Sequence, residues 1–151
     1  MWQLTPEEAR AQFAHFFSFF NQGGAEMKQT RDVPVPGRRG SLRARLYVPR
    51  GVPEVSPGLL YLHGGGFVIG SPETHDRLTR ELAERIGARV LSLDYALAPE
   101  HPYPAGLEDC VDAARWLAAH AAELGMDPRR LLIGGDSAGA NLSGGVEDRT
   151  T

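Results

Sequence analysis

The chain has 151 residues, 42% of them apolar, which is enough to bury a hydrophobic core in a single ordinary domain. Sixteen basic residues are scattered among 19 acidic ones, so the net charge of -3 argues against nucleic-acid binding. The single cysteine excludes an internal disulfide framework, and no apolar run approaches the ~18 residues that a membrane span needs. Because Glu7 and Glu8 stand where a secretory signal would be positively charged, we expect a cytoplasmic protein with no membrane partner.

The first predicted element is a helix that ends near Asn21. Thr5 is expected to be its N-cap, with Pro6 at the first helical position and Glu8 closing a capping box. Four aromatic residues recur at helical spacing and form one stripe, namely Phe13, Phe16, Phe17 and Phe20. On the residues alone, this stripe indicates packing against the domain.

The pattern that follows predicts an α/β fold. A hairpin is expected between residues 27 and 48, turning at 36–40 and forming an antiparallel edge. Strands are then predicted at 59–62, 90–95 and 131–133, with helices at about 74–86 and 105–124 between them. Such alternation is typical of parallel strands joined by crossover helices, so the sheet should be mostly parallel.

The second crossover helix has an apolar face and a charged face. The face expected to pack on the sheet carries Leu107, Cys110, Val111, Ala114, Leu117 and Ala118. The face expected to meet solvent carries Glu108, Asp109, Asp112 and Arg115. Cys110 is therefore interpreted as a small core residue.

A glycine run, His63 to Gly66, follows the strand at 59–62. The backbone amides of Gly65 and Gly66, free of neighbouring side chains, can converge on one oxygen atom. Each such donor can stabilise a developing oxyanion by about 3 kcal/mol. The run therefore predicts one part of an oxyanion hole.

The sequence GDSAG at 135–139 follows the last predicted strand and has the pattern of a nucleophile elbow. Gly135 and Gly139 would let the backbone take a strained turn, with Ser137 exposed at its tip. The amide of Ala138, at the start of the next helix, would supply another oxyanion donor. Each motif alone could be an ordinary glycine-rich turn, but the two in this order and spacing indicate a serine hydrolase.

Three stretches resemble the hormone-sensitive-lipase-like branch of the α/β-hydrolases, the fold-3 group of carboxylesterases and lipases. They are HGGGF at 63–67, DYALAPEHP at 94–102 and GDSAGANL at 135–142. The resemblance implies ester hydrolysis by Ser137, with Gly65, Gly66 and Ala138 as oxyanion donors. Positions expected to support these motifs are His63, Gly64, Gly135, Asp136 and Gly139.

The resemblance also implies an organisation of the chain. Residues 1–24 would form a cap helix over an acyl pocket, which is the alternative to simple packing for the aromatic stripe. Residues 25–146 would be the N-terminal part of the hydrolase domain, and 147–151 a tail unlike the family. The stretch at 94–104 is interpreted either as a wall of the site or as a rigid structural loop.

Two departures from the family stand out. Alanine occupies position 96, where the family usually has arginine, so an ion pair there should be missing. More important, the family's catalytic acid and histidine follow the serine, whereas all five histidines of this chain precede Ser137. His63 is interpreted as a loop-orienting residue and His101 as a hydrogen-bonded loop residue.

These departures predict a chain that is truncated after the elbow and nearly inert alone, because loss of the base can lower turnover about 10⁶-fold. The strand at 131–133 would be left as an exposed sheet edge, which favours self-association. The alternative function is a non-catalytic small-ligand-binding protein on the same scaffold. No glycine pattern or ligand spacing indicates a cofactor or a metal, and the expected partner is a small-molecule ester.

Overall fold

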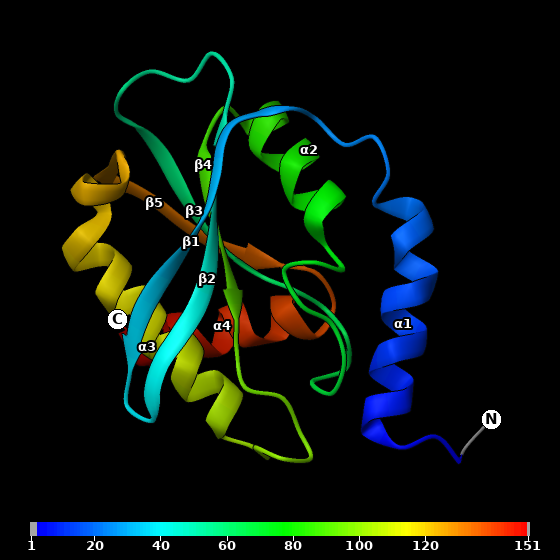
Figure 1. Cartoon of the computed structure of the whole chain (residues 1–151). Helices are drawn as coiled ribbons and strands as arrows, with labels where there is room; N and C mark the ends of the chain where they lie inside the picture. Colours follow the sequence, from blue (N-terminus) through cyan, green and yellow to red (C-terminus); the bar gives the residue numbers. More distant parts are fainter. Residues whose placement is uncertain (1–2, 151) are drawn as a thin grey trace.

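The computed structural model describes residues 3–150, which form a five-stranded sheet with helices on both faces (Figure 1). The strands are β1 (Met27–Gly37), β2 (Gly40–Pro49), β3 (Ser56–Leu62), β4 (Arg89–Asp94) and β5 (Met126–Gly135). The helices are α1 (Pro6–Phe20), α2 (Asp76–Ile86), α3 (Ala105–His120), the short 3₁₀ helix η1 (Ala121–Leu124) and α4 (Ala138–Thr150). The predicted α/β fold class is therefore confirmed.

The order of the strands across the sheet is β1-β2-β4-β3-β5. The hairpin β1–β2 is antiparallel, as predicted, and joins the rest of the sheet through β4. The central strands β4, β3 and β5 run parallel, with Leu60 of β3 opposite both Leu91 and Ile133. Because Leu62 pairs with Gly135, the glycine run after β3 and the GDSAG turn after β5 leave the sheet at the same edge.

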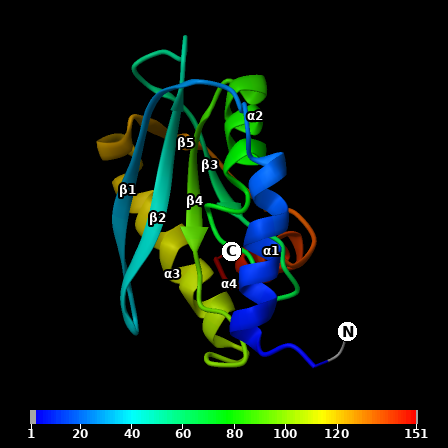
Figure 2. The ribbon, with the colours of Figure 1, turned by 45° about the vertical axis from the view of Figure 1, so that its right-hand side comes forward.

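Each face of the sheet has its own apolar core. Helices α3 and α4 cover one face, where Cys110 and Val146 pack among the strand residues. Helix α2 covers the other face, where Ala83 packs against Tyr47 and Tyr61 (Figure 2). Cys110 is completely buried, which confirms its interpretation as a small core residue.

Two assignments on α3 were wrong. Asp109, predicted to meet solvent, is 2% exposed, because its carboxylate accepts hydrogen bonds from the Arg39 guanidinium and from the backbone amide of Ala96. Ala118, predicted to face the sheet, is exposed, and Ala113 is buried instead. Apolar periodicity could not identify a carboxylate that is buried with a distant partner.

Helix α1 lies to one side of the body formed by the other elements (Figure 1). Its predicted capping box is confirmed, since Thr5 Oγ1 accepts from Glu8 N and Thr5 N donates to the Glu8 carboxylate. No residue of α1 is buried, and Phe16 and Phe20 are more than half exposed. The aromatic stripe therefore does not pack fully against the domain in residues 3–150.

Strand β5 forms the edge of the described sheet, because it pairs only with β3 among residues 3–150. Leu132 on this strand is 60% exposed. The predicted unpaired apolar edge is therefore present in this part of the chain. Self-association through it stays a prediction.

Candidate functional site

The turn between β5 and α4 holds Ser137 in an uncommon backbone conformation. Its φ of 50° lies in the left-handed region, which a non-glycine residue occupies only when its surroundings enforce it. A Cβ atom on Gly135 or on Gly139 would overlap the carbonyl oxygen of Leu62. The turn therefore packs directly against the end of β3, and only glycine fits on either side of the exposed Ser137.

The glycine run after β3 is also shaped by close backbone contacts. Gly65 has a φ of 135° and Gly66 a φ of 60°, and a Cβ atom on Gly65 would overlap the carbonyl oxygen of Ile69. The Gly65 carbonyl accepts hydrogen bonds from the amides of Val68 and Ile69, at 3.1 and 2.9 Å. These bonds turn the loop back on itself and fix the run in place.

Gly65 and Gly66 line the same cavity as Ser137. This cavity has a volume of about 760 Å³, and Phe13 and Phe17 of α1 lie in its wall. Within residues 3–150, the amides of Gly65, Gly66 and Ala138 donate no hydrogen bond, and neither does the Ser137 hydroxyl. The cavity is thus lined by the exposed Ser137 and by Gly65 and Gly66, whose amides are free, whereas buried Ala138 follows Ser137 outside the lining.

Asp136 links the two loops. Its carboxylate accepts hydrogen bonds from the Gly64 amide at 2.9 Å and from the Tyr61 hydroxyl at 2.5 Å, and its other oxygen lies 3.4 Å from His75 Nε2. Partial burial opposes ionisation of Asp136, but the hydrogen bonds from His75 and Tyr61 prevail and hold its pKa well below its usual range. Asp136 therefore joins the elbow to the glycine run as a carboxylate.

His63 is fully buried beneath the glycine run. Its Nδ1 lies 2.8 Å from the Gly64 carbonyl oxygen, to which only a protonated Nδ1 can donate. The His63 carbonyl accepts from the Tyr95 hydroxyl, and the two rings stack with centroids 4.4 Å apart. Burial lowers the pKa of His63, which favours the neutral imidazole. These contacts orient the first residue of the loop.

His75 was missed as a site residue, because no motif in the sequence singles it out. It is 6% exposed, and its Nδ1 lies 2.8 Å from Thr74 Oγ1. Its ring stacks on Phe17 of α1, with centroids 6.0 Å apart. His75 thus contacts both Asp136 and α1. These partners are far from it in the sequence, so no local motif could reveal the contacts.

The other histidines lie elsewhere. His15 stacks edge-on against Phe19 on α1, and His120 stacks on Trp116 at the end of α3. His101 is exposed in the loop before α3. In the part of the chain that the structure describes, no histidine is hydrogen-bonded to Ser137.

A second cavity, of about 400 Å³, lies on the other side of Gly66. The stretch predicted either as a site wall or as a structural loop contributes Tyr95, Ala98, His101 and Tyr103 to its lining. Leu142 of α4 also lines it. The stretch therefore lines a cavity that neighbours the one containing Ser137, with Gly66 in the wall between them.

Among residues 3–150, no group of three histidine, cysteine, aspartate or glutamate side chains could hold a metal ion. No helix in the same range is both long and apolar enough to cross a lipid bilayer.

Comparison with known proteins places this geometry in a family. Residues 59–149, which contain both loops, match the model of a family described as alpha/beta hydrolase fold. Carboxylesterase NlhH of Mycobacterium tuberculosis is 50% identical over 112 residues, covering 74% of this chain and 32% of that protein. Ethyl acetate hydrolase of Pseudomonas putida is 39% identical over 149 residues, covering 95% of this chain and 46% of that protein.

Solved structures agree with the sequence relatives. The hyperthermophilic esterase of the archaeon Pyrobaculum calidifontis superimposes with a TM-score of 0.89 at 44% identity, covering 93% of this chain and 46% of that one. An ester-hydrolase from the Lake Arreo metagenome, complexed with a derivative of bipyridine phosphonate, gives a TM-score of 0.92 at 37% identity, covering 97% and 47%. This chain therefore spans less than half the length of each of these relatives, and it belongs to the alpha/beta hydrolase fold family.

Proposed function

We propose that this chain carries the nucleophile and the oxyanion hole of a carboxylic-ester hydrolase. Ser137 is the proposed nucleophile, and the amides of Gly65, Gly66 and Ala138 are the proposed oxyanion donors. The observation that carries the proposal is the shared cavity, in which the exposed Ser137 stands beside the free amides of the glycine run. The relatives named as esterases support this chemistry.

The reaction follows from this arrangement. Ser137 Oγ attacks the ester carbonyl carbon and gives up its proton to a base, while the carbonyl π electrons move onto oxygen. The oxyanion accepts hydrogen bonds from the loop amides, each of which can contribute about 3 kcal/mol because it is positioned before the reaction. Collapse of this intermediate breaks the ester C–O bond, and the alcohol leaves with the proton held by the base. Water then attacks the acyl carbonyl as it gives a proton to the base, and the carboxylic acid is released when that proton returns to Ser137 Oγ.

Four neighbouring residues hold the elbow and the glycine run in fixed positions relative to each other. Asp136 holds the glycine run against the elbow through the Gly64 amide, and His63 donates to the carbonyl of the same glycine. Gly135 and Gly139 allow the elbow to approach β3 closely. A displacement of about 1 Å at such a site can cost 10²-fold in rate, which explains why both loops need this support.

We further propose that the base comes from outside residues 3–150. His75 has each ring nitrogen beside another partner, Thr74 or Asp136, and buried His63 donates to Gly64. Among the described residues, Nε2 of His63 has no hydrogen-bond partner, but the His63 ring is buried and outside the lining of the Ser137 cavity, so neither imidazole is placed to receive the Ser137 proton. Without a base, an oxyanion hole and substrate binding accelerate hydrolysis by at most about 10³- to 10⁴-fold over the reaction in water. The 151-residue chain should therefore turn over little ester unaided.

The proposed substrate is an ester with a short acyl chain. The relative named ethyl acetate hydrolase supports this size class.

Residues 1–24 are proposed to be a cap, because Phe13 and Phe17 line the cavity that contains Ser137. Residues 25–146 would then be hydrolase domain and 147–151 a tail, although α4 continues through Thr150. Residues 1, 2 and 151 lie outside the described part, and a cytoplasmic location stays a prediction.

The test measures the reactivity of the Ser137 hydroxyl group. The purified chain is incubated with p-nitrophenyl butyrate, and separately with an activated alkyl phosphonate whose covalent adduct is located by mass spectrometry. We expect near-background p-nitrophenol release and slow phosphonylation of Ser137 alone. Ser137→Ala should abolish the adduct, whereas Ser41→Ala, a control at another exposed serine, should not.

Two outcomes would contradict parts of the proposal. An absence of labelling at Ser137, or equal labelling of other serines, would remove the case for an activated position at the elbow. Rapid turnover that depends on Ser137 would show that the base lies within the chain, and would overturn only that part of the proposal.

A further inference from the structure

A cavity of about 470 Å³ lies at the opposite end of the parallel strands from Ser137. Arg89 is the first residue of β4, and Gly125 immediately precedes β5, so this cavity lies at the amino ends of those strands. Residues of β1, β2 and η1 complete its wall. Three basic residues are in the lining, namely Lys28, Arg31 and Arg89.

Arg89 is a buried cation with part of its hydrogen-bonding capacity unused. The residue is only 8% exposed, and its Nη1 donates to the Pro53 carbonyl and to Ser56 Oγ, both at 2.9 Å. Within residues 3–150, its Nε and Nη2 donate no hydrogen bond, and the guanidinium forms no ion pair. The Nε–Nη2 edge is one that can bind two oxygens of a carboxylate or phosphate.

Gly125 allows the backbone to pack against the face of the Arg89 guanidinium. It has a φ of 72°, and a Cβ atom there would lie 2.8 Å from Arg89 Nε, 2.9 Å from Cζ and 3.1 Å from Nη2. These nearly equal distances place that Cβ atom over the plane of the guanidinium and not beyond its edge. A side chain at position 125 would therefore displace Arg89, and its Nε–Nη2 edge with it.

The charge around the cavity is predominantly positive. Lys28 and Arg31 are exposed on β1 and form no ion pair in the described range. Glu123 is the carboxylate in the lining, and Glu54 acts on Arg89 from beyond ion-pair distance. Burial lowers the pKa of Arg89, which means that its charge is incompletely compensated by the protein. An anion in the cavity would supply that compensation.

We propose that this cavity binds a small oxyanion, a carboxylate or a phosphate, through the Nε–Nη2 edge of Arg89, with Lys28 and Arg31 adding charge. The apolar side chains of Leu46, Val48 and Leu124 leave room for a short alkyl group beside the anionic head. The site is separate from Ser137 and does not depend on ester hydrolysis.

The test is a titration of the isotope-labelled chain with inorganic phosphate and, separately, with butyrate, at constant ionic strength set by sodium chloride. We expect saturable NMR shifts of the Arg89 Nε–H and of the Gly125 amide. Tighter binding of phosphate would identify a tetrahedral ligand, and tighter binding of butyrate would identify a carboxylate. Ester turnover is not the readout, so the result is independent of the proposed hydrolase.

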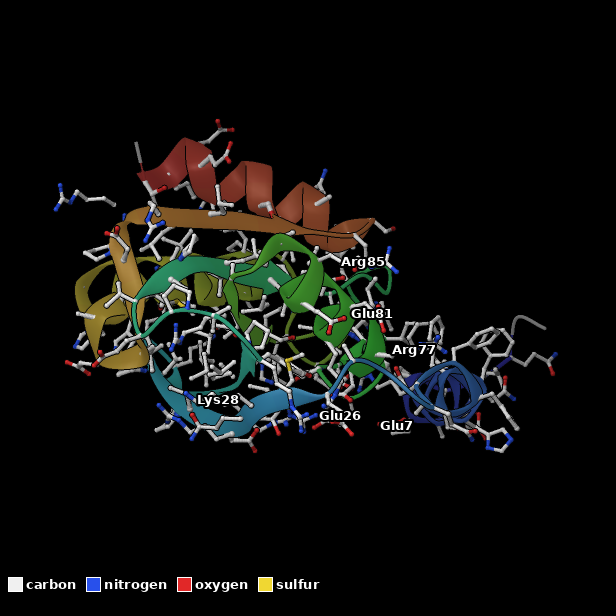
Figure 3. All side chains as sticks on the ribbon, turned by 90° about the horizontal axis from the view of Figure 1, so that it is seen from above. Glu7, Glu26, Lys28, Arg77, Glu81 and Arg85 are labelled. Atoms are coloured by element: carbon white, nitrogen blue, oxygen red, sulfur yellow. The ribbon has the colours of Figure 1, made fainter. Side chains whose placement is uncertain are left out.

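Variants separate a built site from general attraction of anions. Lys28→Gln combined with Arg31→Gln should weaken binding about tenfold without unfolding the chain, since both residues are exposed. Arg85→Gln is the matched control, because Arg85 is an exposed cation on α2, well away from Lys28 (Figure 3). Arg89→Gln should abolish binding, provided that the variant folds.

Two NMR results would overturn the proposed oxyanion site. Shifts that grow linearly with phosphate and butyrate, or that shrink equally in Arg85→Gln and in the Lys28 and Arg31 double variant, would overturn it. If Arg89→Gln does not fold, the double variant alone decides, because its residues make no described contact that the fold requires.

Discussion

The junction between the two loops and the charged cluster beside the hairpin are stabilised in different ways. At the junction, backbone atoms of Leu62 and Ile69 occupy the space that side chains would need at Gly139 and Gly65. In the cluster, Arg43 pairs with both Glu73 and Asp94, and Arg45 with both Glu73 and Asp76.

The two regions differ in whether one contact can substitute for another. A glycine packed against backbone has no alternative arrangement here, because Leu62 ends β3 and Ile69 lies in a loop that is hydrogen-bonded back to Gly65. An exposed ion-pair cluster keeps most of its contacts when one member is removed. We therefore expect single substitutions to have large effects at the junction and small effects in the cluster.

The largest effect is expected at Gly139. Gly139→Ala places a methyl group on the Leu62 carbonyl and should lower the free energy of unfolding by about 3 kcal/mol or more, a loss typical of severe steric conflict. Gly66→Ala is the matched control, because a Cβ atom there meets nothing within 4 Å and suffers only the strain of φ 60°, about 1 kcal/mol. Urea unfolding followed by circular dichroism measures both. Equal losses would refute the steric explanation.

The next effect concerns Asp136. Asp136→Asn can keep the one oxygen that accepts from both Gly64 and Tyr61, but it removes the negative charge and the second oxygen, which lies beside His75 Nε2, and should cost about 1–3 kcal/mol. Since the pKa of Asp136 is lowered by folding, its stabilisation is present above the unfolded pKa of about 3.9 and is lost as pH falls further. Urea midpoints between pH 3 and pH 6 should therefore converge for the variant and the parent. A constant difference across this range would contradict the assignment.

A smaller effect is expected at Glu73. The hydrogen bond from Arg43 outweighs partial burial and lowers the pKa of Glu73 to about 2. Its stabilisation is therefore present above the unfolded pKa of about 4.3 and is lost as pH falls toward 2. Because Glu73 is half exposed, Glu73→Gln should cost under about 1 kcal/mol at pH 7, and Arg43 and Arg45 keep their other partners. A loss above about 2 kcal/mol would show that the cluster is not redundant.

The smallest effect on stability is expected at Leu132, which belongs to neither region. Leu132→Lys should change the free energy of unfolding by under about 0.5 kcal/mol, because the residue is 60% exposed. The same substitution should reduce self-association through β5, since an edge lysine opposes strand pairing. Sedimentation velocity compares the two chains. A parent chain that is monomeric at all concentrations would contradict the predicted association.

The sequence allowed most of the fold to be predicted because its signals are local. The capping box at Thr5 and Glu8, the period-two hairpin and the alternation of helices and strands all lie within short windows. The two loops could be placed together because parallel strands end at one edge of a sheet. Most strand and helix limits moved by only a few residues, but β5 begins at Met126, five residues before the predicted start at 131.

Contacts between distant residues could not be predicted in the same way. Asp109 is buried because Arg39, seventy positions earlier, reaches its carboxylate. His75 joins the site because a helix from the start of the chain stacks on it and Asp136 lies beside it. Arg89 belongs to no sequence motif, and its guanidinium packs against Gly125, which lies far along the chain. Such relations follow from tertiary packing, which no spacing in the sequence records.

Helix α1 is anchored at two polar points. Near its start, Arg10 pairs with Glu100 and donates to the carbonyls of Val68 and Ala98, and at its end Asn21 bonds to the backbone of Glu73 and Thr74. Because no residue of α1 is buried, little apolar area holds it between these points. Its attachment should therefore weaken with ionic strength and open independently of the sheet, as amide hydrogen exchange would register. The helix that supplies the aromatic wall of the Ser137 cavity is thus held mainly by an ion pair and hydrogen bonds near its two ends.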